Sequence, residues 1–211
     1  RFLFYKHLSI NEQLVISNTL KNNQLIKQYW LLNKADRHHS IEVMNRTLRF
    51  SDDLELLQHT FSVSFEQVAH RVTCLQDPKM KGIPFHMLRT DIAGNISKRL
   101  SLSGIQIPRY GGACPRWNIH SAFMLPGKIH SALSKMPDGE KYVCIARTIE
   151  KGIGRHGVYR SILSIGLGCQ AQYAKDFIYA DTINLKDETS ATAIGVNCRT
   201  CPRMDCQQRA F

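Results

Sequence analysis

The spacing of apolar residues changes near residue 79, which divides the chain into a helical part and a part built of strands. Before it, residues 52–61 and 64–76 carry apolar side chains at helical spacing. Ser64 followed by Gln67 is a capping-box pair, and Pro78 ends the second segment. After residue 79, short apolar runs alternate with turn residues, as they do in antiparallel hairpins. Helices followed by hairpins predict the α+β class.

Five strands are predicted after residue 79. Two pairs are joined by turns at Gly94–Asn95 and Asp138–Gly139, and the fifth strand is a run that ends in glycines. The strands and their turns are expected within residues 83–102, 127–151 and 159–168. Between the hairpins, residues 103–123 read as a loop rich in Gly and Pro followed by a short helix. We therefore expect a five-stranded antiparallel sheet with flanking helices.

Three segments follow from this pattern. We expect a helical region at residues 1–78, a ligand-binding sheet domain at 79–168, and a helix plus cysteine-rich tail at 169–211. The chain begins with Arg rather than Met, so we interpret it as a fragment of a longer protein. It contains no apolar run of about 18 residues and no signal-peptide pattern, so we expect no membrane span and a cytoplasmic location.

Positive charge is concentrated in the second part of the chain. Residues 1–78 carry nine Lys and Arg against eight Asp and Glu, whereas residues 79–211 carry nineteen against nine. The two parts therefore contribute +1 and +10 to the formal net charge of +11. This asymmetry predicts an anionic partner for the second part, either nucleic acid or a phosphorylated small molecule. A merely solvated basic surface is the alternative.

The chain ends in NCRTCPRMDCQQRAF, a loop that holds three cysteines: Cys198, Cys201 and Cys206. A metal site with four thiolates needs one more cysteine. Cys169 is the first choice, because it follows a predicted strand where its side chain can face outward, and Cys114 is its competitor. Cys74 lies in a predicted helix and Cys144 in a predicted strand, so both are expected to be small buried residues.

Four thiolates suit either zinc or an iron–sulfur cluster. Structural zinc usually takes two CxxC pairs, and the tail has only one, whereas iron–sulfur clusters accept uneven spacing. A proline after a ligand cysteine, as in Cys201–Pro202, also occurs in ferredoxin loops. The spacing therefore favours an iron–sulfur cluster over zinc, and a free or disulfide-bonded tail is the third interpretation. Disulfides are rare in the reducing compartment that we expect for this chain.

Basic and aromatic residues alternate between the two hairpins. Guanidinium groups and the N–H groups of a Gly–Gly turn suit phosphates, and an aromatic face suits an adenine ring. A nucleotide-like cofactor such as coenzyme A needs all of these. The candidate contacts are Lys98, Arg99, Arg109, Tyr110, Arg116, Trp117 and Phe123. For Trp117, a role as a core anchor is the competing interpretation.

The chain carries no familiar catalytic motif. HExxH, GxSxG and the phosphate-binding P-loop are all absent from the sequence. His120 and His130 lie near the predicted ligand loop, but the sequence pairs neither with a carboxylate. We therefore expect a protein that is not an enzyme. A CoA-dependent transferase that uses His120 or Cys114 is the alternative.

Several blocks, taken in order, resemble the C-terminal portion of the short-chain fatty acyl regulators. These are bacterial transcription factors of the XRE type, which govern propionate, acetate and glyoxylate metabolism. The blocks are DLELLQHTFSVSFEQVAHRVTCLQDP, GIPFHMLRTDIAGNISKR, RYGGACPRWNIHSAF, IGLGC and GVNCRTCPRMDCQQRAF. The resemblance covers residues from about 50 to 211.

The resemblance implies a helix-turn-helix DNA-binding domain ahead of this fragment, then a degenerate metallopeptidase-like region without protease activity. It implies a GAF-like sensor domain that binds coenzyme A or short-chain acyl-CoA and carries a 4Fe-4S cluster, which zinc can replace after aerobic handling. The cluster ligands it implies are Cys169, Cys198, Cys201 and Cys206, and not Cys114. Regulators of this type are expected to form homodimers. The alternative is a zinc-stapled module that binds DNA or protein without sensing acyl-CoA.

Overall fold

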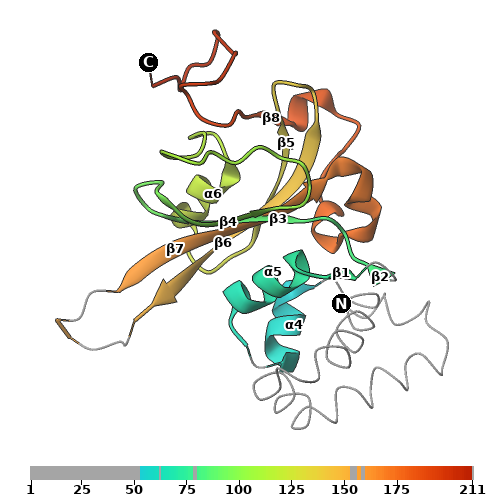
Figure 1. The fold of residues 1–211 in the computed structure, drawn as a ribbon, viewed down its shortest axis with the longest axis vertical. Helices are drawn as coiled ribbons and strands as arrows, with labels where there is room; N and C mark the ends of the chain where they lie inside the picture. The colour runs from blue at the N-terminus through green and yellow to red at the C-terminus, as the bar shows by residue number, and fades with distance from the viewer. Residues whose placement is uncertain (1–52, 62, 78–79, 153–155, 158–159, 211) are drawn as a thin grey trace. The chain divides into compact units, whose positions relative to one another are not determined.

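The computed structural model describes residues 53–61, 63–77, 80–152, 156–157 and 160–210 (Figure 1). The chain divides into two compact units, residues 1–68 and 69–211, whereas the sequence pattern placed the first boundary at residue 78. Of the helical region predicted at residues 1–78, residues 1–52 lie outside the described residues. No helix in the described ranges is long and apolar enough to cross a membrane.

Both helices predicted just before residue 79 are present as α4 (Leu54–Phe61) and α5 (Phe65–Thr73). The Asp53 carboxylate accepts two backbone N–H groups of the first turn of α4, at 3.0 and 3.1 Å. At the start of α5, the Gln67 amide donates to the Ser64 hydroxyl over 3.2 Å, and the Ser64 amide donates to the Gln67 side chain over 2.8 Å. The predicted capping box is therefore confirmed. α5 begins in the first unit and ends in the second.

A mixed six-stranded sheet forms the centre of the second unit, with strand order β4-β3-β7-β6-β5-β8. Its strands are β3 (His86–Asp91), β4 (Ile96–Ser101), β5 (His130–Lys135), β6 (Lys141–Lys151), β7 (Ser161–Gln170) and β8 (Thr192–Ala193). The five predicted strands are the first five, and they pair antiparallel. The prediction of a purely antiparallel five-stranded sheet is wrong, because β8 adds to β5 in parallel. A separate two-stranded sheet joins β1 (Gln76–Asp77) and β2 (Met80–Lys81).

The predicted turns fall where glycine is needed. Gly94 lies in the β3–β4 turn with φ of 83°, and Gly139 lies in the β5–β6 turn with φ of 93°. This left-handed backbone region is costly for other residues. Both hairpins are therefore encoded locally, by their turn residues and by the alternation of their strands.

One face of the sheet is covered by the segment between the hairpins, which contains α6 (Asn118–Ser121) and the 3-10 turn η2 (Ala122–Met124). Gly166 and Gly168 of β7 point to this face. A side chain on Gly166 would meet Ile119 at 3.1 Å, and one on Gly168 would meet the His86 ring at 2.6 Å. Because side chains alternate along a strand, odd-numbered residues of β7 point to the opposite face.

The helix predicted after residue 169 is wrong. The segment instead forms three separate 3-10 turns: η3 (Ala171–Asp176), η4 (Ile178–Ala180) and η5 (Glu188–Ser190). Ala174, Phe177 and Ala180 are buried, and their spacing of three fits a 3-10 turn better than an α-helix. Phe177 has extended backbone angles between two of the turns, and its ring packs on Phe85 with centroids 5.2 Å apart.

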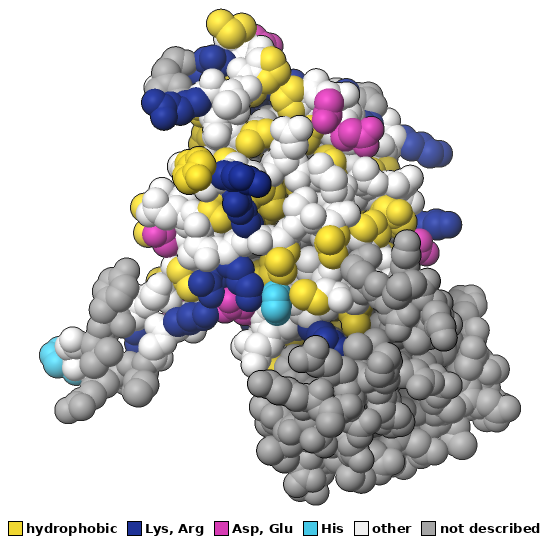
Figure 2. Space-filling view, viewed as in Figure 1, with side chains coloured by type: hydrophobic (Ala, Val, Ile, Leu, Met, Phe, Trp, Pro, Cys, Tyr) yellow, Lys and Arg dark blue, Asp and Glu magenta, His cyan; other side chains and the backbone are white. Residues whose placement is uncertain are grey.

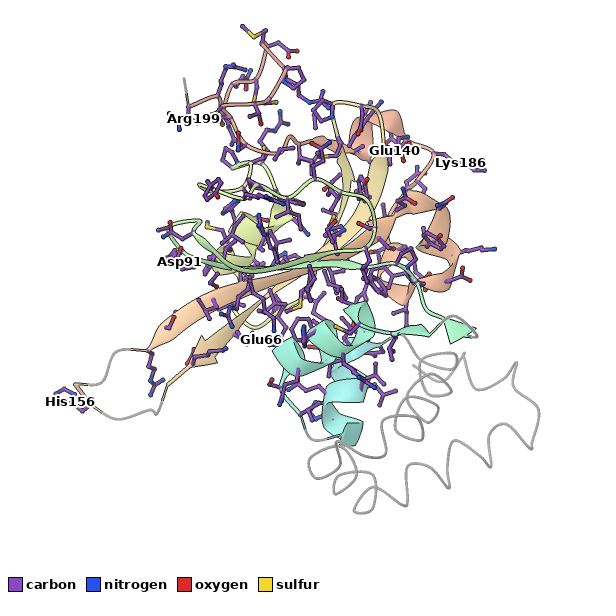
Figure 3. The ribbon with its side chains drawn as sticks, in the orientation of Figure 1. Glu66, Asp91, Glu140, His156, Lys186 and Arg199 are labelled. Carbon is purple, nitrogen blue, oxygen red and sulfur yellow. The ribbon has the colours of Figure 1, made fainter. Side chains whose placement is uncertain are left out.

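β6 and β7 run past β3 as a two-stranded arm. Their pairing continues to Lys151 and Ser161, whereas β3 ends opposite Leu163. Figure 3 labels His156 at the far end of this arm and Arg199 in the cysteine tail, at the other end of the sheet unit. The tail is therefore remote from the arm and close to the β5 and β8 edge.

Candidate metal and ligand site

The cysteine tail leaves the sheet through β8. The Ile194 amide donates to the carbonyl of Lys135, the last residue of β5, over 3.0 Å, and the Ile194 side chain is only 1% exposed. Val196 then packs against the hydrophobic core on the α6 face. The start of the tail is therefore fixed to the sheet unit by its backbone and by its apolar side chains.

Two cysteines from distant parts of the chain, Cys114 and Cys201, each contact the start of the tail, at residues 196 and 195. The Cys114 amide donates to the carbonyl of Val196 over 3.1 Å. The Cys201 sulfur lies so close to Gly195 that a side chain at residue 195 would come within 2.8 Å of it. Glycine is therefore required at residue 195 for Cys201 to take this position. The contact brings Cys114 to the cysteine tail, although the sequence separates them widely.

The rest of the tail closes on itself. The Cys198 thiol lies 3.9 Å from the carbonyl oxygen of Gln208, and the Arg209 amide donates to the Cys206 carbonyl over 3.1 Å. None of the seven cysteines, all of which the structure describes, forms a disulfide, so the tail is not a disulfide knot in this structure. The three tail thiols are half-buried: Cys198, Cys201 and Cys206. They share one compact loop at the edge of the sheet.

Cys169 is not placed as expected. It lies inside β7 rather than after it, pairs with Val143 and is fully buried. Its neighbour Gly168 points toward His86 on the α6 face, so the Cys169 side chain points to the opposite face. Cys114 packs in the core of the α6 face, together with Ile194. The expectation that Cys169 faces outward is therefore wrong, and the structure brings Cys114 to the tail instead.

The donor chemistry of the tail fits a thiolate-bound metal, but the thiols are not gathered into a finished site. In the part of the chain that the structure describes, no three His, Cys, Asp or Glu side chains are grouped so that they could hold a metal ion. The four cysteines that the family resemblance implies as cluster ligands are thus not brought together: Cys169, Cys198, Cys201 and Cys206. Metal binding by the tail requires its thiols to converge from the positions seen here.

Sequence reasoning missed two arginines that hold the tail. Arg203 donates to the carbonyls of Ile194 and Lys135 over 3.4 and 3.2 Å. Arg209 donates to the carbonyls of Cys201 and Arg203 over 3.2 and 2.8 Å. Their only signal in the sequence is position, because Arg203 follows Cys201 by two residues and Arg209 follows Cys206 by three. Both guanidinium groups bond to backbone oxygens, which no sequence pattern reveals.

Trp117 is a core anchor, as the competing interpretation held. It is 2% exposed, and its ring lies beside that of His86 with centroids 6.2 Å apart. The Cys144 sulfur lies 3.7 Å from the Nε2 atom of His86, and burial raises the pKa of this thiol to about 11. Burial lowers the pKa of His86 to about 3. Both groups are therefore neutral at ordinary pH and serve the core.

The burial of Cys144 is confirmed, but the expectation for Cys74 is wrong. Cys74 follows the last residue of α5 and is exposed, with its sulfur 3.8 Å from the Nε2 atom of His70. The helix ends one residue before Cys74, so the sulfur does not share the buried face of α5. Cys74 lies outside the tail and takes no part in the candidate site.

Lys98 and Arg99 cannot act as a pair. Arg99 pairs with Leu88, which lies in the core on the α6 face, whereas Lys98 pairs with Arg89, which points to the other face. Arg99 donates to the carbonyl of Pro108 over 2.9 Å and so ties β4 to the loop. Only Arg99 is therefore on the same side as the rest of the predicted ligand loop.

The outer part of that loop is open to a ligand. Arg109 and Arg116 are exposed, and Tyr110 is 87% exposed, next to Gly111 with φ of 79°. Phe123 is half-buried in η2. A hollow of about 330 Å³ separates the loop from the tail, and its lining residues are Arg116, Asp205, Gln207 and Gln208. Arg116 therefore faces the cysteine tail across an open space.

His120 lies between the loop and the β3–β4 turn. Burial lowers its pKa, although a hydrogen bond to the backbone of Cys114 acts in the opposite direction. Its Nε2 atom is buried and has no hydrogen-bond partner among the described residues. The ring also packs against Gly94, where an added side chain would meet it at 3.3 Å. His120 thus connects Cys114 to the hairpin turn.

Charge on the visible face is dispersed. Figure 2 shows Lys and Arg side chains at several separate places over the sheet unit, with fewer Asp and Glu side chains between them. Among the described residues they do not merge into one basic stripe on this face. A local anion site at the loop fits this distribution better than a long nucleic-acid track.

Comparison with known proteins identifies what the chain is similar to. The family model described as "Short-chain fatty acyl coenzyme A regulator, C-terminal" matches residues 74–211. The HTH-type transcriptional regulator RamB of Mycobacterium tuberculosis is 44% identical over 164 residues, which are 77% of this chain and 35% of that protein. The propionyl-CoA carboxylase regulator of Cereibacter sphaeroides is 46% identical over 158 residues, which are 75% of this chain and 34% of that protein.

A third relative and a solved structure agree with these two. The HTH-type transcriptional regulator PrpR of Mycobacterium tuberculosis is 42% identical over 160 residues, which are 75% of this chain and 33% of that protein. A solved structure described as a Mycobacterium tuberculosis transcriptional regulator superposes with a TM-score of 0.75 at 38% identity, over 83% of this chain and 53% of that one. The chain thus spans about a third of the length of the curated relatives it matches.

Proposed function

The chain belongs to the short-chain fatty acyl coenzyme A regulator family, and we propose that its residues 74–211 form the effector-sensing end of a transcriptional regulator. The observation that carries the proposal is the family match, which covers the whole six-stranded sheet and the cysteine tail. The relatives are named as regulators rather than enzymes. DNA would be bound by a helix-turn-helix domain outside these 211 residues, and the genes controlled would serve short-chain fatty acid metabolism such as that of propionate.

The tail would carry a 4Fe-4S cluster on Cys198, Cys201 and Cys206. Both Cys114 and Cys169 are buried, but Cys114 is the better fourth ligand, because its backbone bonds to Val196 beside Cys201, whereas Cys169 lies in β7 on the opposite face. The cluster would supply thiolate-bound iron that responds to oxidation or iron supply. The residues named here would hold it and would tie the tail to the segment before α6.

The effector would be coenzyme A or a short-chain acyl-CoA, held at the open loop. Arg109 and Arg116 would bind phosphate oxygens, and Tyr110 would offer its exposed ring to the adenine. Lys98 is excluded from this set because it points to the other face of the sheet. Binding alters regulation only if the effector prefers one of two arrangements of the whole protein.

Metal content tests the cluster. The full chain is purified without oxygen, and iron, acid-labile sulfide and zinc are measured together with the absorbance spectrum. Near-equal iron and sulfide at about four per chain supports the cluster. One zinc per chain with neither iron nor sulfide, under strict anaerobic conditions, would favour a zinc-stapled interaction module instead. Zinc found only after exposure to air does not decide between them.

Calorimetry tests the effector. Propionyl-CoA and coenzyme A are titrated into the full chain and into a double variant, Arg109→Ala with Arg116→Ala. A weaker affinity in this variant is expected, because two phosphate contacts are lost. The matched control replaces two exposed lysines that follow β7, Lys175→Ala with Lys186→Ala, which removes the same charge elsewhere. Equal weakening in both variants would mean that only net charge attracts the ligand, and no heat at millimolar ligand would overturn acyl-CoA sensing.

A further inference from the structure

We propose that Arg203 and Arg209 hold the tail in a compact loop, from which its thiols converge when a metal binds, and supply fixed positive charge beside the bound centre. The inference rests on the proposed metal site and goes beyond it, because it assigns a role to two side chains that are not ligands. Both arginines lie within three residues of a tail cysteine, and both are half-buried. Their hydrogen bonds show how each could control the shape of the loop.

Arg203 fixes the loop to the sheet. Its Nη2 atom donates to the carbonyl of Lys135 at the end of β5, and its Nε atom donates to the carbonyl of Ile194 just after β8. The Ile194 amide donates to the same Lys135 carbonyl. One guanidinium therefore bonds to two neighbouring strand ends and holds the residue two positions after Cys201 against them.

Arg209 fixes the loop to itself. Its Nη1 atom donates to the carbonyls of Cys201 and Arg203, and its amide donates to the carbonyl of Cys206. This one residue therefore connects the segments that carry two of the three tail thiols. Loss of the side chain would leave Cys206 free to move away from Cys201, while the chain between them stays intact.

Both arginines also place charge where a metal–thiolate centre needs it. Four thiolates exceed the positive charge of either a zinc ion or an oxidised 4Fe-4S core, so the filled site is anionic. Among the described residues, no carboxylate pairs with Arg203, whose two hydrogen bonds go to carbonyl oxygens. Its charge is therefore available to the filled site, and partial burial limits its screening by water. Groups just outside the ligands commonly tune a metal site in this way.

Arg199 provides a matched contrast. It lies between Cys198 and Cys201, so it is as close in sequence to the ligands, but it is exposed. Water screens its charge more strongly than that of a half-buried guanidinium. Replacing Arg199 removes the same formal charge from the tail without removing the contacts described for Arg203 and Arg209.

The test compares Arg203→Gln, Arg203→Lys, Arg209→Gln and Arg199→Gln in the full chain, reconstituted with iron and sulfide without oxygen. Loss of iron to a chelator is followed by absorbance, and the reduction potential is measured on the loaded protein. We expect Arg203→Gln and Arg209→Gln to lose iron about 10–100-fold faster than wild type and Arg199→Gln to stay near wild type. We expect Arg203→Lys to keep the wild-type potential, since it keeps the charge. We expect it to lose iron faster, since it lacks the two separate nitrogens with which the guanidinium bonds the two carbonyls.

Failure of the inference and failure of the metal site are distinguishable. If wild type takes up no iron and no zinc, the proposed site falls and the inference with it. If wild type is loaded and all four variants release iron at the wild-type rate with the wild-type potential, the metal site stands and the inference is overturned. If Arg203→Gln does not fold, Arg203→Lys and Arg209→Gln decide, and wild-type behaviour in both would overturn the proposal.

Discussion

The backbone amide of Cys114 donates a 3.1 Å hydrogen bond to the carbonyl of Val196, which joins the segment before α6 to the start of the cysteine tail. The bond places Cys114 beside Gly195, against which the Cys201 sulfur packs. Two of the seven cysteines thus lie at one point of the fold, although no local pattern connects them. The consequences can be measured separately for metal binding, stability and acid tolerance.

Cys114→Ser is expected to reduce the iron content of the anaerobically loaded chain to well below half of wild type, because it removes the proposed fourth thiolate. Serine keeps the size of the side chain and leaves the amide that bonds to Val196. Iron and sulfide per chain are the measurement, made on protein shown by circular dichroism to be folded.

Cys169→Ser is the control for this substitution. Cys169 is fully buried on the other face, so a hydroxyl there is expected to destabilise the fold by about 1–3 kcal/mol and to leave the iron content unchanged. The reverse outcome, with iron lost in Cys169→Ser and kept in Cys114→Ser, would restore the ligand set that the family resemblance implies and would reject Cys114.

Trp117→Ala is expected to lower the free energy of unfolding by about 3–5 kcal/mol, because a fully buried indole is removed from the core of the α6 face. Tyr110→Ala, in the same loop, is expected to change it by less than about 0.5 kcal/mol, because that ring is 87% exposed. Urea unfolding measures both. A large loss in Tyr110→Ala, or a small one in Trp117→Ala, would show that the two aromatic roles have been assigned the wrong way round.

The sequence was most informative where structure is local. Alternation, turn glycines and the Ser64–Gln67 pair correctly predicted five strands and two helices. β8 was missed because two residues give no periodic signal, and its parallel pairing with β5 depends on a contact between distant segments. The prediction of a helix after residue 169 failed because apolar residues three positions apart resemble the pattern of an α-helix over so short a stretch.

The candidate site was harder to predict because glycine can mark the end of a strand or a position inside a strand where other residues pack closely. The run IGLGC suggested a strand end, which would let Cys169 face outward. In the structure β7 continues to Gln170, and Gly166 and Gly168 are there because Ile119 and His86 pack against their backbone. The side that Cys169 faces follows from that extra length, and sequence spacing alone could not supply it.

Acid should destabilise the fold through His86. Burial lowers the pKa of this imidazole to about 3 from the ordinary value of 6.5, so below pH 6.5 the unfolded chain binds a proton that the folded chain does not. The contribution of neutral His86 to the free energy of unfolding is fully present above pH 6.5. It is lost as the pH falls toward 3, at up to about 1.4 kcal/mol per pH unit. Denaturant unfolding of wild type is expected to show about half of this slope at pH 6.5 and to approach all of it near pH 5.

His86→Gln removes the titrating group. In the same pH range, the change of the free energy of unfolding per pH unit is therefore expected to be smaller by the contribution of His86, whatever the absolute stability of the variant. His156→Gln, at the exposed end of the β6–β7 arm, is expected to keep the wild-type slope. An unchanged slope in His86→Gln would contradict a buried neutral imidazole.

Gly168→Ala tests whether His86 and β7 are packed as tightly as the structure has them. The added methyl carbon would lie 2.6 Å from the His86 ring and 2.8 Å from the carbonyl oxygen of Val143, and a backbone oxygen in a central strand pair cannot move aside easily. Destabilisation by about 1–3 kcal/mol or more is expected. Gly166→Ala is the matched control in the same strand and on the same face, because its nearest atoms are the ends of the Ile119 and Leu88 side chains, at 3.1 and 3.2 Å. Those ends can rotate, so thermal unfolding should show a clearly smaller loss for Gly166→Ala. Equal losses would mean that alanine is unfavourable throughout this strand, and the specific contact between Gly168 and His86 would no longer be needed to explain either.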